Sequence, residues 1–117
     1  MTIYDQGDVV LVHFPFTDLT AIKQRPALVI SARWFNEKPD GDCILAAITS
    51  VIPQRLARDE TRIPDDALKS AGLVKPSIVR AGKLFTLNQS LVQRRLGHLP
   101  PETLQPALNK FADIISK

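Results

Sequence analysis

The chain has 117 residues and a formal net charge of +3, with 44% hydrophobic and 23% charged residues. This length suits a single domain over residues 1–117, with a composition able to bury a core. Cys43 is the lone cysteine, which excludes an internal disulfide framework and a cysteine-based zinc site and favours a cytoplasmic setting. We expect Cys43 to be a small buried residue. Neither a membrane-length apolar run nor a signal pattern occurs, so we expect no membrane association. The mild basic excess suits an anionic partner such as RNA or an acidic protein.

The first half of the chain predicts strands joined by irregular loops. Residues 9–14 are apolar at nearly every position, which is typical of a strand buried on both faces or lying in a closed sheet. Pro26 is expected to begin the second strand because it cannot donate a hydrogen bond to a sheet ladder. The predicted elements are a strand at 9–14, a loop at 15–24, a strand at 26–31, a short helical turn at 34–36 and a strand at 42–49.

The second half predicts further strand regions and ends in a helix. Gly82 interrupts an apolar strand pattern, which indicates a bulge or a sharp bend. The predicted elements are an edge strand at 61–63, a helical segment at 65–70 stopped by Gly72, a strand region at 77–87, a short helix at 89–96 stopped by Gly97 and a C-terminal helix at 101–115.

The C-terminal helix has one apolar stripe, formed by Leu104, Leu108, Phe111 and Ile115. A proline in a helix interior costs about 3 kcal/mol, so Pro106 predicts a distorted first turn or a later start. About five short strands joined by loops rather than helices favour an antiparallel sheet or a small barrel. We therefore predict a mainly β fold with a C-terminal helix.

An arginine and a pair of hydroxyl groups stand at strand ends where they can carry chemistry. Arg25 lies where a loop meets the second strand, and its planar guanidinium can bind two phosphate oxygens. An ion pair with Asp18 or Asp8 would equally account for Arg25. Thr49 and Ser50 follow the third strand, where hydroxyl groups either bind a phosphate or cap a turn.

A second arginine and the two histidines complete the candidates. Arg80 lies among apolar residues, where an unpaired cation is costly to bury, so it faces solvent, a carboxylate or a ligand. A bulge at Gly82 would bring Lys83 to the same side. His13 is a candidate general base or a partly buried structural residue. His13 and His98 lie far apart in the sequence without a carboxylate cluster, so we expect neither a metal nor a cofactor.

Four segments in this order resemble a known family. They are GDVVLVHFPF, RPALVIS, AAITS and SIVRAGKLFTL, and the match extends from Gly7 through the final helix. The chain is similar to the MazF/PemK toxins of bacterial type II toxin–antitoxin systems. The resemblance implies an SH3-like barrel with a C-terminal helix, a homodimer, and a metal-independent endoribonuclease that cuts single-stranded RNA. It also implies an antitoxin partner that wraps the active groove.

The resemblance also implies which residues act. The arginine of the RP element and the hydroxyl of the I-T element are catalytic in the family, which matches Arg25 and Thr49. Some members use the arginine of the V-R element, which matches Arg80, together with an aspartate two residues further on, where this chain has Gly82. The loop histidine that some members carry between the first two strands is also absent. The further residues expected to bind RNA are Lys23, Ser50, Arg55 and Lys83.

Metal-free RNA cleavage suits this sparse set of residues. The substrate's own 2′-OH attacks the adjacent phosphorus, so the protein must hold the nucleotide in line and neutralise charge on the phosphorane oxygens. Arg25 and Arg80 can supply the positive charge, while Thr49 can orient the phosphate or relay a proton. Because RNA brings its own nucleophile, no carboxylate nucleophile is required.

Two other functions are compatible with the sequence. One is a gyrase poison that shares the fold and acts by binding; such proteins end in Trp-Gly-Ile, whereas this chain ends in Ile-Ile-Ser-Lys. The other is a non-catalytic SH3-like interaction module, which the glycine at position 82 leaves possible.

Overall fold

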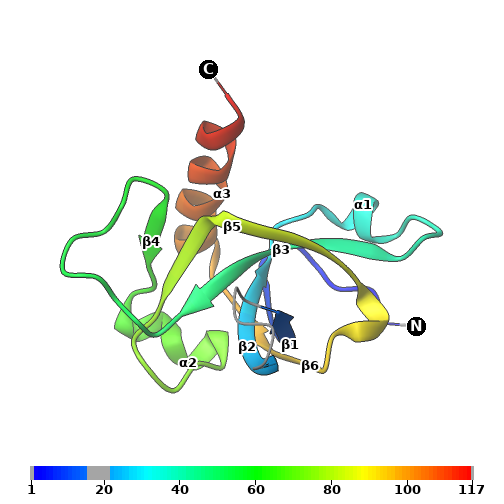
Figure 1. Cartoon of the computed structure of the whole chain (residues 1–117), viewed down its shortest axis with the longest axis horizontal. Helices are drawn as coiled ribbons and strands as arrows, with labels where there is room; N and C mark the ends of the chain where they lie inside the picture. Colours follow the sequence, from blue (N-terminus) through cyan, green and yellow to red (C-terminus); the bar gives the residue numbers. More distant parts are fainter. Residues whose placement is uncertain (1, 16–21, 117) are drawn as a thin grey trace.

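The computed structural model of the chain describes residues 2–15 and 22–116. Six strands among these residues form one sheet in the order β4-β5-β3-β2-β1-β6, and every neighbouring pair is antiparallel (Figure 1). The strands are β1 (Asp8–Pro15), β2 (Ile22–Val29), β3 (Asp42–Thr49), β4 (Glu60–Arg62), β5 (Ile78–Asn88) and β6 (Arg94–His98). Among these residues β4 and β6 are the two edges, so a mainly β sheet is confirmed and its closure into an SH3-like barrel is not.

The helical elements are short except for the last. They are α1 (Arg33–Asn36), the 3₁₀ turn η1 (Asp65–Ala67), α2 (Leu68–Ala71), the 3₁₀ turn η2 (Gln89–Leu91) and α3 (Pro101–Ile115). Helix α3 packs against β4 and β5 near one edge of the sheet (Figure 1). The predicted elements at 34–36, 42–49, 61–63, 65–70, 77–87 and 101–115 are therefore confirmed, with small shifts at their ends.

The start of the second strand is a correction. Strand β2 begins at Ile22, so residues 22–24 belong to the strand and not to the expected loop; residues 16–21 of that loop lie outside the described residues. Pro26 lies inside β2, opposite Leu11 of β1. The ladder with β3 begins only at Ala27, so the preceding part of β2 is an edge on that side, where a missing N–H is tolerated.

The predicted helix at 89–96 is also wrong. Only Gln89–Leu91 form a helical turn, and Arg94–His98 form β6, which pairs with β1. Gly97 does not end a helix but lets β6 approach α2 closely: a Cβ added there would lie 2.2 Å from the carbonyl oxygen of Ser70. Gly72 does stop α2, with a left-handed φ of 72° that favours glycine.

Both faces of the sheet bury apolar side chains. One face packs against α2 and α3 around Val9, Leu28, Ile48, Val79 and Leu99. The opposite face packs around Val10, Val12, Val29, Cys43 and Leu45. Within β1, Val9, Val10 and Val12 are fully buried, which confirms the expected burial on both faces.

Helix α3 runs from residue 101 to residue 115 with Pro106 inside it, so the expected later start is wrong. Three members of its apolar stripe, Leu104, Leu108 and Phe111, pack against the core. The fourth, Ile115, is 71% exposed and is not among the residues that pack against this core. Within the described part of the chain, no helix has both the length and the apolar character needed to cross a membrane.

The bulge predicted at Gly82 is present and shapes β5. Ala46 faces Leu84 across the β3–β5 ladder, and the next residue, Ala47, faces Arg80, so residues 81–83 are looped out of register. The backbone N–H groups of Ala81 and Gly82 donate to the carbonyl and to the carboxylate Oδ2 of Asp59, each at 3.1 Å. The bulge is thus held by the segment that leads into β4.

Candidate active site

The strand register places Arg25, Thr49 and Arg80 on one face of the sheet. Side chains of a strand alternate between faces, so Arg25 shares a face with Ala27, and Thr49 shares one with Ala47. Ala27 pairs with Ala47, and Ala47 pairs with Arg80. The three residues therefore come from β2, β3 and β5 and lie side by side across the sheet.

A pocket of about 160 Å³ joins these three side chains. Its lining residues are Arg25, Ala47, Ile48, Thr49, Val51 and Arg80. The buried alanine at position 47 leaves room between the two arginines, both of which are partly exposed. Two guanidinium groups and a hydroxyl around one small hollow form an arrangement that suits a phosphate.

Two further pockets adjoin this one within the described residues. One, of about 160 Å³, shares Arg25, Ile48 and Thr49 with it. Its other lining residues are Pro26, Ser50, Leu73, Val74, Lys75 and Ser77. The second, of about 230 Å³, shares Thr49, Val51 and Arg80 and adds Pro53 and Glu60. The central pocket is thus part of a longer depression, with Lys75 at one end and Glu60 at the other.

Glu60 is a functional candidate that the sequence did not reveal. It faces Arg80 across the β4–β5 ladder, and its Oε2 lies 3.4 Å from Arg80 Nε. Its Oε1 accepts a hydrogen bond of 2.7 Å from the backbone N–H of Ala57. The pairing joins residues 20 positions apart through a strand of three residues, so no local spacing indicates it.

The Thr49 hydroxyl has one interaction along its own chain. Its Oγ1 accepts a hydrogen bond of 3.1 Å from the backbone N–H of Val51, two residues further on. This contact is the turn-capping role expected of a hydroxyl at a strand exit. The hydroxyl still has its own proton to donate, and the side chain lines all three pockets, so capping and phosphate binding are compatible.

Of the remaining predicted RNA-binding residues, one lines these pockets and three do not. Ser50 lines the pocket that contains Lys75. The other three are exposed and line none of these pockets: Lys23 in β2, Arg55 in the segment before β4, and Lys83 in the β5 bulge. Lys75 was not predicted, because it stands in a short turn before β5 without a motif around it.

Both histidines lie apart from the arginine pocket. His13 pairs with Gln24, one residue out of phase with Arg25, so it points to the opposite face of the sheet. His98 Nδ1 lies 2.8 Å from Oδ1 of the buried Asp8, which also pairs with Arg95 at 2.8 Å. This cluster joins β6 to β1. The described residues contain no group of three or more His, Cys, Asp or Glu side chains suited to a metal ion.

Burial changes the acidity of one group on the same face of the sheet, further along β3. Cys43 is fully buried in β3, which confirms the expected small buried residue. Burial, with a smaller contribution from the neighbouring Asp42, raises the pKa of the Cys43 thiol from 9.0 to about 11. The thiol is therefore neutral at physiological pH and does not serve as a nucleophile.

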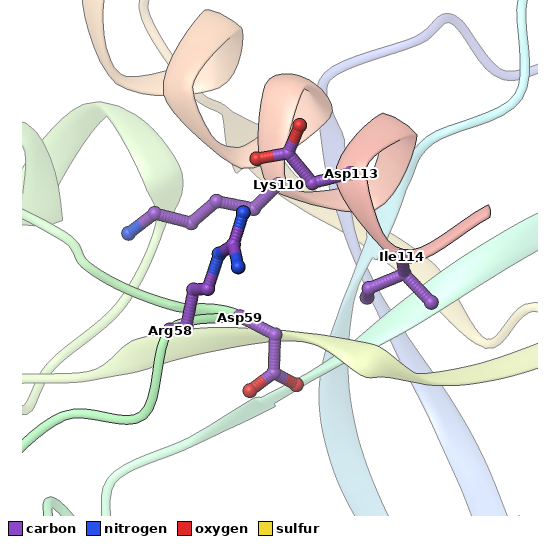
Figure 2. A pocket seen from close by; sticks show the side chains of 5 residues that line it. All are labelled: Arg58, Asp59, Lys110, Asp113 and Ile114. Atoms are coloured by element: carbon purple, nitrogen blue, oxygen red, sulfur yellow. The ribbon is translucent and has the colours of Figure 1, made fainter. Parts of the chain in front are cut away.

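A separate pocket of about 190 Å³ lies between the segment before β4 and the end of α3 (Figure 2). Its lining residues are Arg58, Asp59, Lys110, Asp113 and Ile114. Two cations and two carboxylates share this pocket, so it offers an anion much less net attraction than the arginine pocket. None of the residues proposed from the sequence lines it.

Residues 5–115 match the family of PemK-like, MazF-like toxins of type II toxin–antitoxin systems, and the chain belongs to this family. The family predicted from the four sequence segments is thereby confirmed. No curated protein sequence matches the chain.

Solved structures show the same fold. A MazE–MazF complex from Deinococcus radiodurans matches with a TM-score of 0.75 and 20% identity, over 99% of this chain and 98% of that chain. MazF from the same organism matches with a TM-score of 0.75 and 20% identity, over 98% of each chain. A mycobacterial endoribonuclease in complex with its cognate antitoxin matches with a TM-score of 0.74 and 17% identity, over 94% of this chain and 92% of that chain.

Proposed function

We propose that this toxin is a metal-independent endoribonuclease that cleaves single-stranded RNA through the substrate's own 2′-OH. The observation that carries the proposal is the pocket shared by Arg25, Thr49 and Arg80 on one face of the sheet. Family membership supports the same activity, as do the structural neighbours described as endoribonucleases.

The chemistry assigns each side chain a role. The 2′-oxygen loses its proton and bonds to phosphorus, the bond from phosphorus to the 5′-oxygen breaks, and the leaving oxygen takes up a proton. Arg25 and Arg80 stabilise the negative charge that grows on the phosphorane oxygens. Thr49 orients the phosphate or relays a proton. The products are a 2′,3′-cyclic phosphate and a 5′-hydroxyl.

The adjoining pocket supplies space for a neighbouring nucleotide. Pro26, Leu73 and Val74 offer apolar surface for a base, and Lys75 offers a charge for the next phosphate. Val74 is 95% exposed, so a base can reach it without displacing protein. Ser50, in the same pocket, is available for a hydrogen bond to the sugar or the base.

The toxin acts in the cytoplasm as a homodimer and is neutralised by a cognate antitoxin that covers the RNA groove. The mycobacterial endoribonuclease was solved with its cognate antitoxin, which supports such a partner here. A dimer of this kind would bury on the order of 1,200 to 2,000 Å² in total. Light scattering at micromolar concentration is expected to give a dimer mass, and a stable monomer would contradict this part of the proposal.

The proposal is tested with a fluorogenic single-stranded RNA in the presence of EDTA. Wild-type protein is expected to cleave it, and Arg25→Ala is expected to lose about 10²- to 10³-fold in rate, as for other preorganised charge partners at a transition state. Circular dichroism establishes that the variant is folded. Equal activity in Arg25→Ala and wild type would make Arg25 structural and favour a binding module.

A further inference from the structure

We propose that Glu60 is a positioning residue that holds the Arg80 guanidinium in place for the scissile phosphate. The inference rests on the proposed ribonuclease function and adds to it a carboxylate. Glu60 lines the pocket that Thr49 and Arg80 share, so it lies at the site itself and not in a distant part of the fold.

Glu60 is fixed more firmly than a surface carboxylate. Its residue is only 8% exposed, and Oε1 accepts the hydrogen bond from the Ala57 N–H at 2.7 Å. Its backbone carbonyl accepts a hydrogen bond of 2.6 Å from Lys110 Nζ on α3. The carboxylate therefore has a defined position, set by the edge strand, by the turn before it and by the helix.

The fixed Glu60 carboxylate contacts Arg80 at one atom, Nε. Its side chain is 40% exposed against 10% for Glu60, and the ion pair runs from Nε to Oε2 at 3.4 Å. Because the ion pair uses Nε, it restrains the guanidinium group without engaging the two terminal nitrogens. Those two nitrogens are the pair that binds two oxygens of one phosphate.

Positioning explains Glu60 better than a direct proton transfer does. One carboxylate oxygen is already engaged by Ala57 and the other faces Arg80, and both lie in a buried side chain. A carboxylate beside a phosphate also repels it. Removing the charge of Glu60 should therefore leave RNA affinity unchanged or raise it, while the rate of cleavage falls because Arg80 loses its orientation.

The test compares Glu60→Gln with wild type. The glutamine keeps an oxygen for the Ala57 N–H, so the fold should be preserved. We expect kcat in EDTA to fall about 10- to 100-fold, as a misplaced catalytic group does. The dissociation constant for an all-deoxyribose oligonucleotide, which cannot be cleaved, should be equal or lower. Asp59→Asn neutralises the neighbouring carboxylate, which accepts a hydrogen bond from the Gly82 N–H, and should leave kcat unchanged.

A double variant separates positioning from other roles. In an Arg80→Ala background, Glu60→Gln should change kcat by less than about twofold, because its effect passes through Arg80. A further large loss in that background would mean that Glu60 acts directly, and would overturn the inference. A parallel loss of affinity and unfolding midpoint in Glu60→Gln would make Glu60 structural and would overturn it too.

Other outcomes separate this inference from the proposed function. Full activity of Glu60→Gln beside an active wild type would overturn the role of Glu60 alone. A wild-type protein that cleaves no RNA would overturn both. Should Glu60→Gln unfold, Glu60→Asp keeps the charge but withdraws it from Arg80 by one methylene, and the folded variant is expected to show the same loss of kcat.

Discussion

The carboxylate of Asp59 occupies the space that a side chain at Gly82 would fill. Asp59 Oδ2 accepts the hydrogen bond from the Gly82 N–H at 3.1 Å, and a Cβ added to Gly82 would lie 2.6 Å from the same oxygen. At Gly82, in the V-R element, the missing side chain therefore leaves room for the carboxylate of Asp59, which comes from another part of the chain. The β5 bulge and the segment before β4 depend on each other through this contact.

Gly82→Ala should therefore destabilise the protein. The new methyl group displaces the Asp59 carboxylate, and the loss of its hydrogen bond costs about 1 kcal/mol of unfolding free energy. Urea unfolding measures the cost, and Asp59→Ala supplies the control background. In the Asp59→Ala background the space is already vacant, so Gly82→Ala should lower the unfolding free energy by clearly less. An equal loss of unfolding free energy in both backgrounds would show that the two residues are not coupled.

The salt dependence of RNA binding tests the role of the two arginines. Log affinity for a single strand should fall linearly with log salt concentration, and each phosphate contact contributes a slope of about −0.7. Arg25→Ala and Arg80→Ala should each make the total slope less negative by about that amount. Fluorescence anisotropy with an uncleavable oligonucleotide gives the slope. Glu37→Gln, far from these pockets in sequence, serves as a charge control, and a slope unaffected by either arginine variant would place the RNA elsewhere.

Thr49 should contribute through its hydroxyl. Thr49→Val keeps the shape and removes the donor, and we expect about a 10²-fold loss in kcat, which is typical when one preorganised donor is lost. The same variant leaves the Val51 N–H without its acceptor, at a cost of about 1 kcal/mol in stability. Thr49→Ser should restore most of the rate. Cleavage kinetics and urea unfolding separate the two effects, and a fully active Thr49→Val would limit Thr49 to turn capping.

Stability should decline at alkaline pH because of Cys43. Burial raises the pKa of its thiol from 9.0 to about 11, so between these values the unfolded chain has released a proton that the folded chain retains. The unfolding free energy therefore falls as pH rises through this window, by on the order of 2 kcal/mol over the whole of it. Cys43→Ala should reduce that decline, and an identical decline in wild type and variant would contradict the account.

The sequence predicted the arginine pocket better than the carboxylate beside it. Arg25 precedes a proline and an apolar strand, and Thr49 carries a hydroxyl at the end of a strand. Both patterns depend only on neighbouring residues in the sequence, so they can be recognised without the fold. Glu60 meets Arg80 through a ladder between distant segments. Only the assembled sheet brings that pair together, so a reading of local patterns could not find it.

In the fold, too, elements with a strong local sequence pattern were predicted, and an element that depends on tertiary pairing was not. Strand β3 and helix α3 have strong local patterns, and both appear where they were predicted. Strand β6 has the sequence RRLGH, which has little β-branched or aromatic character. It is a strand because β1 offers it a partner, and Gly97 permits close contact with α2. Tertiary pairing outweighs local preference there.

A single substitution in the substrate tests most directly whether the 2′-OH of the RNA is the nucleophile. An RNA oligonucleotide that the toxin cleaves at one identified bond is prepared again with deoxyribose only at the nucleotide whose 2′-OH would attack. In EDTA, we expect cleavage of the all-RNA strand to a 2′,3′-cyclic phosphate and a 5′-hydroxyl, and no cleavage at the deoxy position. Mass spectrometry identifies the products. Equal cleavage of both strands, or cleavage that stops when EDTA is added, would contradict the mechanism.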